Sequence, residues 1–355
     1  MAGLIIRQAG EADHGALEEL FSATPMGSGI RIGFERGPDY FAGARVQAES
    51  PSVWGAFEDD GGARGIFSAG SRRVWVDGEM QVRYLSDLRI HAACQGSFLL
   101  ARGYRLLRRE VFRPGEWAQT LVLENNLPAL ELLTSRRGGL PDYRPAGRYV
   151  SWLLPRQRIA GAPGVLVRPA AQEDLEPMQA LLDAASRRRS FAGMVSLHEL
   201  EKPEWKNLIV GDFLVAERHG AIVGMMGVWD QSGFQRLRIH SYSRAIAALR
   251  PLSNAWAKVC GGIALPPAGK ALPLRKATAV ACHGDEPAIL RALLSKALGG
   301  NQQDMLLLGF SVQDPLTEAL KGLKARIEYG RHFLVGWEGS PPSWREPFAF
   351  DAARI

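Results

Sequence analysis

The chain has 355 residues, with 43 Lys or Arg against 37 Asp or Glu and a formal net charge of +6. A hydrophobic content of 46% beside 23% charged residues is typical of a globular protein and excludes a disordered chain. The length predicts two domains, because a single core rarely grows beyond about 250–300 residues.

Other simple features narrow the class of protein. No apolar run approaches the roughly 20 residues that span a bilayer, and the first residues, MAGLIIRQAGEADHG, lack the pattern of a signal peptide. Cys94, Cys260 and Cys282 are scattered without metal-ligand spacing, which argues against a zinc site and favours a reducing, cytoplasmic compartment. No aromatic-rich RNA motif accompanies the basic residues, so we expect neither nucleic acid nor membrane as a partner.

The start of the chain is repeated near its middle. Leu4–Arg7 heads LIIRQAGEADHGALEELF, and Val165–Arg168 heads VLVRPAAQEDLEPMQALL. Arg7 aligns with Arg168, and Asp13 aligns with Asp174. Each copy reads as a short strand followed by a helix that the aspartate can cap. A repeat of this length predicts two similarly folded halves.

Further landmarks recur in the same order in both halves. They are a hairpin, a strand that leads into a helix with an early proline, and a closing strand: Val53–Ala69, Thr120–Pro128 and Gly147–Tyr149, then Leu214–Trp229, Met305–Pro315 and Gly330–His332. We interpret the chain as a tandem duplication with domains at 1–155 and 164–340 and a tail at 341–355. Outside the pattern, we expect Thr24–Tyr40 to form a loop over a site and Leu249–Leu274 a surface excursion.

The most informative stretch is Val82–Arg109. Residues Val82–His91 alternate as in a strand, and from Ser97 the apolar period becomes helical. Between them lies the small-residue turn Gln95-Gly96-Ser97. A strand that passes through such a turn into a helix points free backbone N–H groups at the turn, which suits an anion such as a pyrophosphate.

Two segments resemble the GCN5-related N-acetyltransferase (GNAT) family. They are LRIHAACQGSFLLARGYRLL at Leu88–Leu107 and VLENNLPALELL at Val122–Leu133, and the order of elements resembles that family once per half. The resemblance implies an α/β fold (α+β by some labels) with a mixed sheet in each of two tandem GNAT-like domains. It also implies acetyl-CoA as co-substrate and transfer of its acetyl group to an amine.

The resemblance places the cofactor along the strand, the turn and the second segment. The implied cofactor-binding residues are Leu88, Ile90, Gln95, Gly96, Ser97, Phe98, Leu99, Leu100 and Asn126. The backbone N–H near Ile90 would polarise the thioester carbonyl. Phe98 and Leu100 occupy positions where the family has small residues, so we expect their N–H groups to reach the phosphates only if both side chains turn inward.

Three residues are candidates for proton transfer. Asp87 lies inside the central strand, and we predict it to be the base that takes the amine's proton; the alternative is a structural pair with Arg83, Arg89 or a backbone group. Glu124 is a second candidate base, or else a solvated loop carboxylate. Family members often carry a Tyr as general acid where this chain has Leu133, and Tyr143 replaces it only if the loop 138–144 folds over the thioester.

The second half departs further from the family. Its corresponding turn is Cys282-His283-Gly284-Asp285-Glu286-Pro287, in which Asp285 is a good cap for its own helix. Two carboxylates at this place would repel a pyrophosphate. We therefore expect the second half to bind no CoA and to wall the acceptor pocket instead.

The leading hypothesis is an acetyl-CoA-dependent N-acetyltransferase that works through the first half on a small-molecule amine or a peptide. One alternative is a non-catalytic GNAT-fold module that binds a small ligand or a protein. Another is an acyltransferase for longer acyl groups, with Phe98 and Leu100 lining the acyl pocket. The residues identify neither the acceptor nor the oligomeric state.

Overall fold

The computed structural model describes residues 3–27, 29–136, 139–260, 262–299 and 304–355. The strands of the first half are β1 (Ile5–Gln8), β2 (Ile30–Glu35), β3 (Glu49–Phe57), β4 (Ala63–Trp75), β5 (Glu79–Ile90), β6 (Ala118–Leu123) and β7 (Asp142–Leu154). Its helices are α1 (His14–Ala23), α2 (Tyr40–Gln47), α3 (Leu99–Glu110) and α4 (Leu127–Leu133).

The second half follows the same plan. Its strands are β8 (Leu166–Pro169), β9 (Ala192–Gly193), β10 (Phe213–Arg218), β11 (Ala221–Trp229), β12 (Arg236–Tyr242), β13 (Leu274–Cys282), β14 (Met305–Ser311) and β15 (Arg326–Gly336). Its helices are α5 (Leu175–Ser186), α6 (Arg244–Cys260) and α7 (Pro287–Gly299), and a short 3₁₀ helix, η9 (Ala352–Arg354), closes the tail. No helix in the described ranges is long and apolar enough to cross a membrane.

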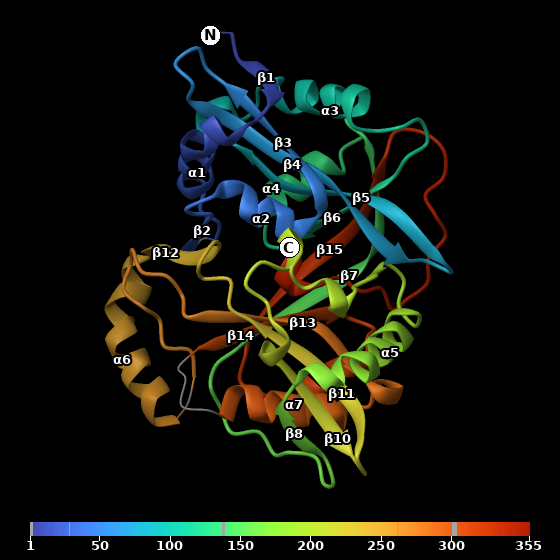
Figure 1. The fold of residues 1–355 in the computed structure, drawn as a ribbon. Helices are drawn as coiled ribbons and strands as arrows, with labels where there is room; N and C mark the ends of the chain where they lie inside the picture. The colour runs from blue at the N-terminus through green and yellow to red at the C-terminus, as the bar shows by residue number, and fades with distance from the viewer. Residues whose placement is uncertain (1–2, 28, 137–138, 261, 300–303) are drawn as a thin grey trace.

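Both halves contribute to one mixed sheet, whose strand order is β1-β3-β4-β5-β6-β15-β7-β14-β13-β11-β10-β8 (Figure 1). The two halves exchange their closing strands: β15 lies between β6 and β7, and β7 pairs with β14. The α/β class with a mixed sheet is confirmed. The exchange of strands was not predicted, and it makes the two halves a continuous structure at the centre of the sheet.

The repeated start of each half has the same local chemistry. Arg7 donates to both carboxylate oxygens of Asp13 at 2.7 Å, and Arg168 donates to Asp174 at 2.6 and 2.9 Å. Each aspartate also accepts the backbone N–H three residues before it, at 2.9 Å and 2.7 Å respectively. Each aspartate stands at the N-cap of its helix, α1 or α5, but its side chain accepts from the preceding turn and makes no hydrogen bond to the helix backbone, so the predicted side-chain cap was wrong.

Helices cover both faces of the sheet in each half. In the first half, α1 and α2 pack on one face of β3 and β4, while α3 and α4 pack on the other face with β5 and β6. In the second half, α5 and α7 take the two corresponding faces. The core is thus formed by layers on either side of a single sheet.

A second, two-stranded sheet joins the halves. Strand β2 pairs with β12 in antiparallel register, from Arg236 opposite Glu35 to Tyr242 opposite Ile30. The expected loop at Thr24–Tyr40 was therefore wrong in part, because its middle forms β2. A local pattern gives no hint of this pairing, since the partner strand lies in the other half of the chain.

The tail packs between the two halves, with Phe348 and Phe350 in a cluster that includes Tyr84 and Tyr149 of the first half. Residues Pro347 and Ala349 bond to the backbone of Ser190, and Phe348 between them is fully buried. The ring of Phe348 lies where a Cβ on residue 147 would be, so Gly147 is required for this close approach. The helix η9 that follows contacts both β13 and β14.

Beside the tail, burial makes His332 sensitive to acid. Desolvation, with a smaller effect of Arg72, lowers the pKa of His332 to about 3. Below about pH 6.5 the unfolded histidine takes up a proton while the native one stays neutral, so the unfolded state gains stability as pH falls. We expect the free energy of unfolding to drop by about 3 kcal/mol from this residue between pH 6.5 and pH 4.

Urea unfolding of wild type and a His332→Gln variant at both pH values measures this contribution. The variant is expected to lose less stability than wild type on acidification, because glutamine does not titrate. An equal loss in the two proteins would show that other groups cause the acid sensitivity.

Candidate functional site

A bulge in β5 opens the centre of the first half. Asp87 has a positive φ of 58°, and the register with β4 shifts there. Strands β5 and β6 pair only from Arg83 opposite Ala118 to Tyr84 opposite Gln119. Beyond Tyr84 the two parallel strands separate, which leaves the edge of β5 at Asp87–Ile90 without a strand partner on that side.

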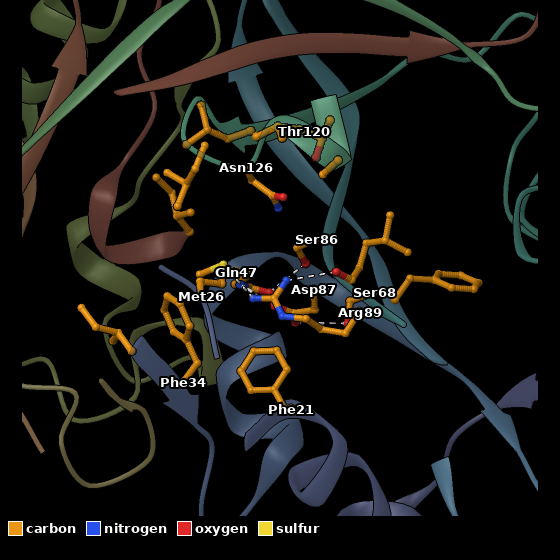
Figure 2. Close-up of a pocket in the computed structure, with 18 of the residues that line it drawn as sticks. Phe21, Met26, Phe34, Gln47, Ser68, Ser86, Asp87, Arg89, Thr120 and Asn126 are labelled. Atoms are coloured by element: carbon orange, nitrogen blue, oxygen red, sulfur yellow. Dashed lines mark hydrogen bonds between the residues drawn. The ribbon is translucent and has the colours of Figure 1, made fainter. Parts of the chain in front are cut away.

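A cavity of about 400 Å³ passes through this gap (Figure 2). On the face of α3 and α4 it is lined by Leu88, Leu100, Tyr104, Asn126 and Tyr143. On the opposite face it reaches α1, the β2–β12 ribbon and the start of β13, where it is lined by Phe21, Ile32, Phe34, Ile239, Leu274 and Lys276. Most of its lining is aliphatic or aromatic, as in binding sites for apolar ligands.

The turn before α3 lies at the surface, at one end of this gap. Gly96 has φ of +76°, whereas Phe98 has φ of −73°, a conformation open to any residue. The Phe98 side chain is 84% exposed, so it does not have the inward orientation that was the condition for its N–H group to reach a phosphate. Because its side chain points to solvent and its φ does not require glycine, Phe98 leaves the backbone at the start of α3 accessible.

The predicted cofactor residues fall into two groups. Leu88, Ile90, Leu99, Leu100 and Asn126 line the cavity. The turn residues Gln95, Gly96, Ser97 and Phe98 lie outside it and are exposed. This arrangement is what a ligand with a polar end at the turn and an apolar end in the cavity requires.

Asp87 is held in a buried ion pair. Arg36, which directly follows β2, donates to both of its carboxylate oxygens, and the two side chains are only 2% and 5% exposed. Tyr40, Gln47 and Ser68 each place a polar atom 3.4 Å from the same carboxylate. The pairing that was the alternative to a catalytic role is thus present, but its partner is Arg36, and a carboxylate so surrounded by donors is poorly placed to accept a proton.

Glu124 is also paired. Arg148 donates to its carboxylate at 2.7 and 3.0 Å, and Arg331 donates at 3.2 Å. The hydrogen bonds from Arg148 hold the pKa of Glu124 below its usual value. Glu124 does not line the cavity, although Leu123 and Asn125 on either side of it do. Its position and its pairing both argue against the predicted role as a base.

Tyr143 lies in β7 and not in a loop. It is buried on the α3 side of the cavity, and its hydroxyl is hydrogen-bonded to that of Tyr104. Burial raises the pKa of Tyr143 well above its usual value and the pKa of Tyr104 to about 12. Both phenols stay protonated, so they offer hydrogen bonds to a ligand and do not release protons readily.

The sequence analysis missed three basic residues in the cavity wall. Arg36, Arg89 and Lys276 come from the end of β2, from β5 and from β13. Two adjacent basic residues, Arg275 and Lys276, in the otherwise apolar run LRKATAVAC were a usable signal, since charges in a central strand are unusual. No local sequence pattern predicts that Lys276 lies at the cavity of the first half, because its position there depends on how the two halves pack together.

The second half repeats the bulge, but its gap is closed. Ala279 has φ of 46° at the same place in β13, and β13 and β14 pair only over Leu274–Lys276. Here the tail enters: Asp351 accepts a 2.6 Å hydrogen bond from Thr278, and η9 packs on both strands. The protein's own tail thus reduces this space to a cavity of about 120 Å³, against about 400 Å³ in the first half.

The carboxylates of the second turn are neutralised. Asp285 accepts from Arg188 and Arg189 at 2.7–2.9 Å, and Glu286 accepts from Arg218 at 2.9 Å. The side chain of Asp285, predicted to cap its own helix, is engaged by Arg188 and Arg189, which follow α5. Arg188, Arg189 and Arg218 are thus already engaged by carboxylates at this turn.

No family model and no curated protein matches the sequence. Solved structures do match the fold. The GCN5-related glucosamine N-acetyltransferase region of a fungal multi-domain GH3 β-N-acetylglucosaminidase has a TM-score of 0.59 at 9% identity, over 94% of this chain and 38% of that one. A GCN5-related N-acetyltransferase from Sphaerobacter thermophilus has a TM-score of 0.51 at 14% identity, over 96% and 98% of the two chains.

Saccharomyces cerevisiae N-myristoyltransferase with bound myristoyl-CoA has a TM-score of 0.59 at 11% identity. That match covers 100% of this chain and 84% of the yeast chain. These three matches agree with the architecture described above, in which the central strands bulge and separate and helices cover both faces of the sheet. The chain has the GNAT fold.

Proposed function

We propose that this protein is an acyl-CoA-dependent N-acyltransferase whose first half binds the donor. The observation that carries the proposal is the open gap between β5 and β6, continuous with a large apolar cavity and next to the start of α3. At the corresponding gap in the second half the tail leaves a cavity of only about 120 Å³, which supports one donor site per chain.

In this proposal the donor lies along the gap. Its pyrophosphate accepts hydrogen bonds from the backbone at the start of α3, where a helix N-terminus favours negative charge. Its pantetheine follows the unpaired edge of β5 past Leu88 and Ile90, opposite Asn126. The thioester then reaches the bulge at Asp87, and the acyl chain enters the apolar part of the cavity.

The cavity supports an acyl group longer than acetyl. An acetyl group has a single methyl to bury, whereas this cavity continues past the gap to the β2–β12 ribbon between Ile32, Ile239 and Leu274. The yeast neighbour was solved with myristoyl-CoA bound, which is a long-chain donor. Acetyl-CoA would be the shortest of the acyl donors in this proposal. The acyl-pocket role predicted for Phe98 does not fit its exposed side chain.

The chemistry is a direct transfer. The lone pair of the acceptor amine attacks the thioester carbon, a C–N bond forms and the C–S bond breaks. The amine loses one proton and the departing CoA sulfur gains one, so an amide and a free thiol result. The protein's contribution is to align the two reactants and to exclude water, which alone accounts for a large part of such rate enhancements.

A change of charge in the turn tests where the donor binds. Ser97→Glu is expected to weaken binding of decanoyl-CoA by about tenfold or more, because its carboxylate would lie beside the pyrophosphate. Ser97→Gln loses the same Ser97 hydrogen bonds to Cys94 and Leu99 without adding charge, so it is the matched control. Calorimetric titration measures both, and equal affinities for the two variants would contradict a pyrophosphate site at this turn.

One observation favours the second candidate, a non-catalytic binding module. Neither predicted base is free, since Asp87 is paired with Arg36 and Glu124 with Arg148. Tight binding of an acyl-CoA without transfer to any amine, and with the thioester intact after incubation, would favour this alternative.

A further inference from the structure

The cavity carries more positive than negative charge. Six charged side chains line it: Arg36, Asp87, Arg89, Lys276, Arg326 and Glu328. Arg36 is neutralised by Asp87, and Arg326 is neutralised by Glu328 at 2.7 Å. Arg89 and Lys276 remain, and within the described ranges neither forms an ion pair with an acidic side chain. Two uncompensated basic groups in an apolar cavity favour an anionic ligand.

Arg89 lies on the face of the sheet away from the proposed donor. Its guanidinium extends over Phe21 toward Met26, on the side of α1 and β2 (Figure 2). One Nη donates to the Leu88 carbonyl at 3.0 Å, and the other is 3.8 Å from the Met26 sulfur, a weak acceptor. Most of the five N–H donors of Arg89 therefore have no strong acceptor in the protein.

Lys276 reaches the cavity from the other half of the chain. Its side chain is 6% exposed, and its amine makes no hydrogen bond within the described ranges. Burial, with a smaller effect of Arg36, lowers the pKa of Lys276 to about 7, while Asp351 acts in the opposite direction. Burial also lowers the pKa of Arg89, while the charges of Asp87 and Tyr40 act in the opposite direction and Arg36 has the smallest effect. Arg89 and Lys276 line the same cavity, Arg89 from β5 and Lys276 from β13.

Resting on the proposed acyltransferase function, we propose that the acceptor is a free amino acid whose carboxylate is bound by Arg89 and Lys276. A planar carboxylate matches the fork of a guanidinium, and a nearby ammonium adds a second donor. In an amino acid the amine is one carbon away from the carboxylate. A carboxylate held at Arg89, next to the bulge, thus keeps the amine close to the gap where the thioester of the proposed donor would lie.

The product of such a reaction is an N-acyl amino acid, which provides a probe that needs no donor. We would titrate N-decanoylglycine and its neutral analogue N-decanoylglycinamide into the full chain and measure heats of binding. The acid is expected to bind at least about tenfold more tightly than the amide, since only the acid forms charge-assisted hydrogen bonds. In Arg89→Met this preference is expected to fall to about threefold or less, and in Lys276→Met to decrease in the same direction.

Within the described ranges neither side chain forms an ion pair, so these substitutions break none, and melting temperatures verify that the variants fold. A preference for the amide, equal binding of acid and amide to wild type, or an unchanged ratio in Arg89→Met would overturn the inference. Decanoyl-CoA is titrated in parallel. If it binds while neither probe binds, the acceptor class is wrong and the acyltransferase proposal stands; if it also fails to bind, the proposed function itself is wrong.

Discussion

Replacement of Asp87 by asparagine is expected to lower the free energy of unfolding by about 3–5 kcal/mol. The change leaves the Arg36 guanidinium, which is 2% exposed, without a counter-charge in the interior, and loss of one partner of a buried ion pair typically costs this much. Asparagine keeps the shape of the side chain and tolerates the positive φ of 58° at this bulge, so the backbone is not an additional cause. Urea unfolding at neutral pH measures the loss.

An exposed ion pair provides the matched control. Glu338 pairs with Arg108 at the surface, and Glu338→Gln is expected to cost less than about 1 kcal/mol. A cost below about 1 kcal/mol for Asp87→Asn as well would contradict the buried network. The expected loss of stability also affects the interpretation of activity assays. An inactive Asp87 variant identifies a catalytic base only if the variant is shown to be folded at the assay temperature.

Truncation of Phe348 to alanine is expected to destabilise the protein by about 3–5 kcal/mol. Its ring is fully buried against Gly147 and lies 4.7 Å from the His332 ring, in a cluster with Phe350 and Tyr149. Removal of a large aromatic side chain from such a site leaves a cavity that its rigid neighbours do not fill. Thermal and urea unfolding both report the change.

Phe98→Ala removes the same atoms from a side chain that is 84% exposed, and it is expected to change stability by about 0.5 kcal/mol or less. Similar effects of the two substitutions would mean that the tail is not part of the core. A large difference would show that Phe348 anchors the tail in the core of the protein.

Local signals in the sequence predicted much of the fold. The alternating residues of β5, the hairpins β3–β4 and β10–β11, and the paired starts at Arg7 and Arg168 are confirmed. These elements form from residues close together within one half of the chain, so local periodic patterns are enough to predict them. The exchange of β7 and β15 and the pairing of β2 with β12 were missed because their partners lie in the other half.

The site was predicted less completely, for a similar reason. Leu88, Ile90, Leu100 and Asn126 share one cavity as expected, because they lie on consecutive elements of one unit. The partner of Asp87 was not identified, since Arg36 approaches it from 51 residues away. Lys276 was missed because a strand of the second half reaches the cavity of the first.

The most direct test of the proposed function is to titrate acetyl-CoA and decanoyl-CoA into the protein by calorimetry. Burial of a methylene group contributes about 0.8 kcal/mol, so even partial burial of the longer chain is expected to make decanoyl-CoA bind about 100-fold more tightly or better. That result would support donor binding with the acyl chain in the apolar cavity. Equal affinity for the two donors would contradict a long-chain acyl site, and absence of binding by both would contradict an acyl-CoA-dependent enzyme.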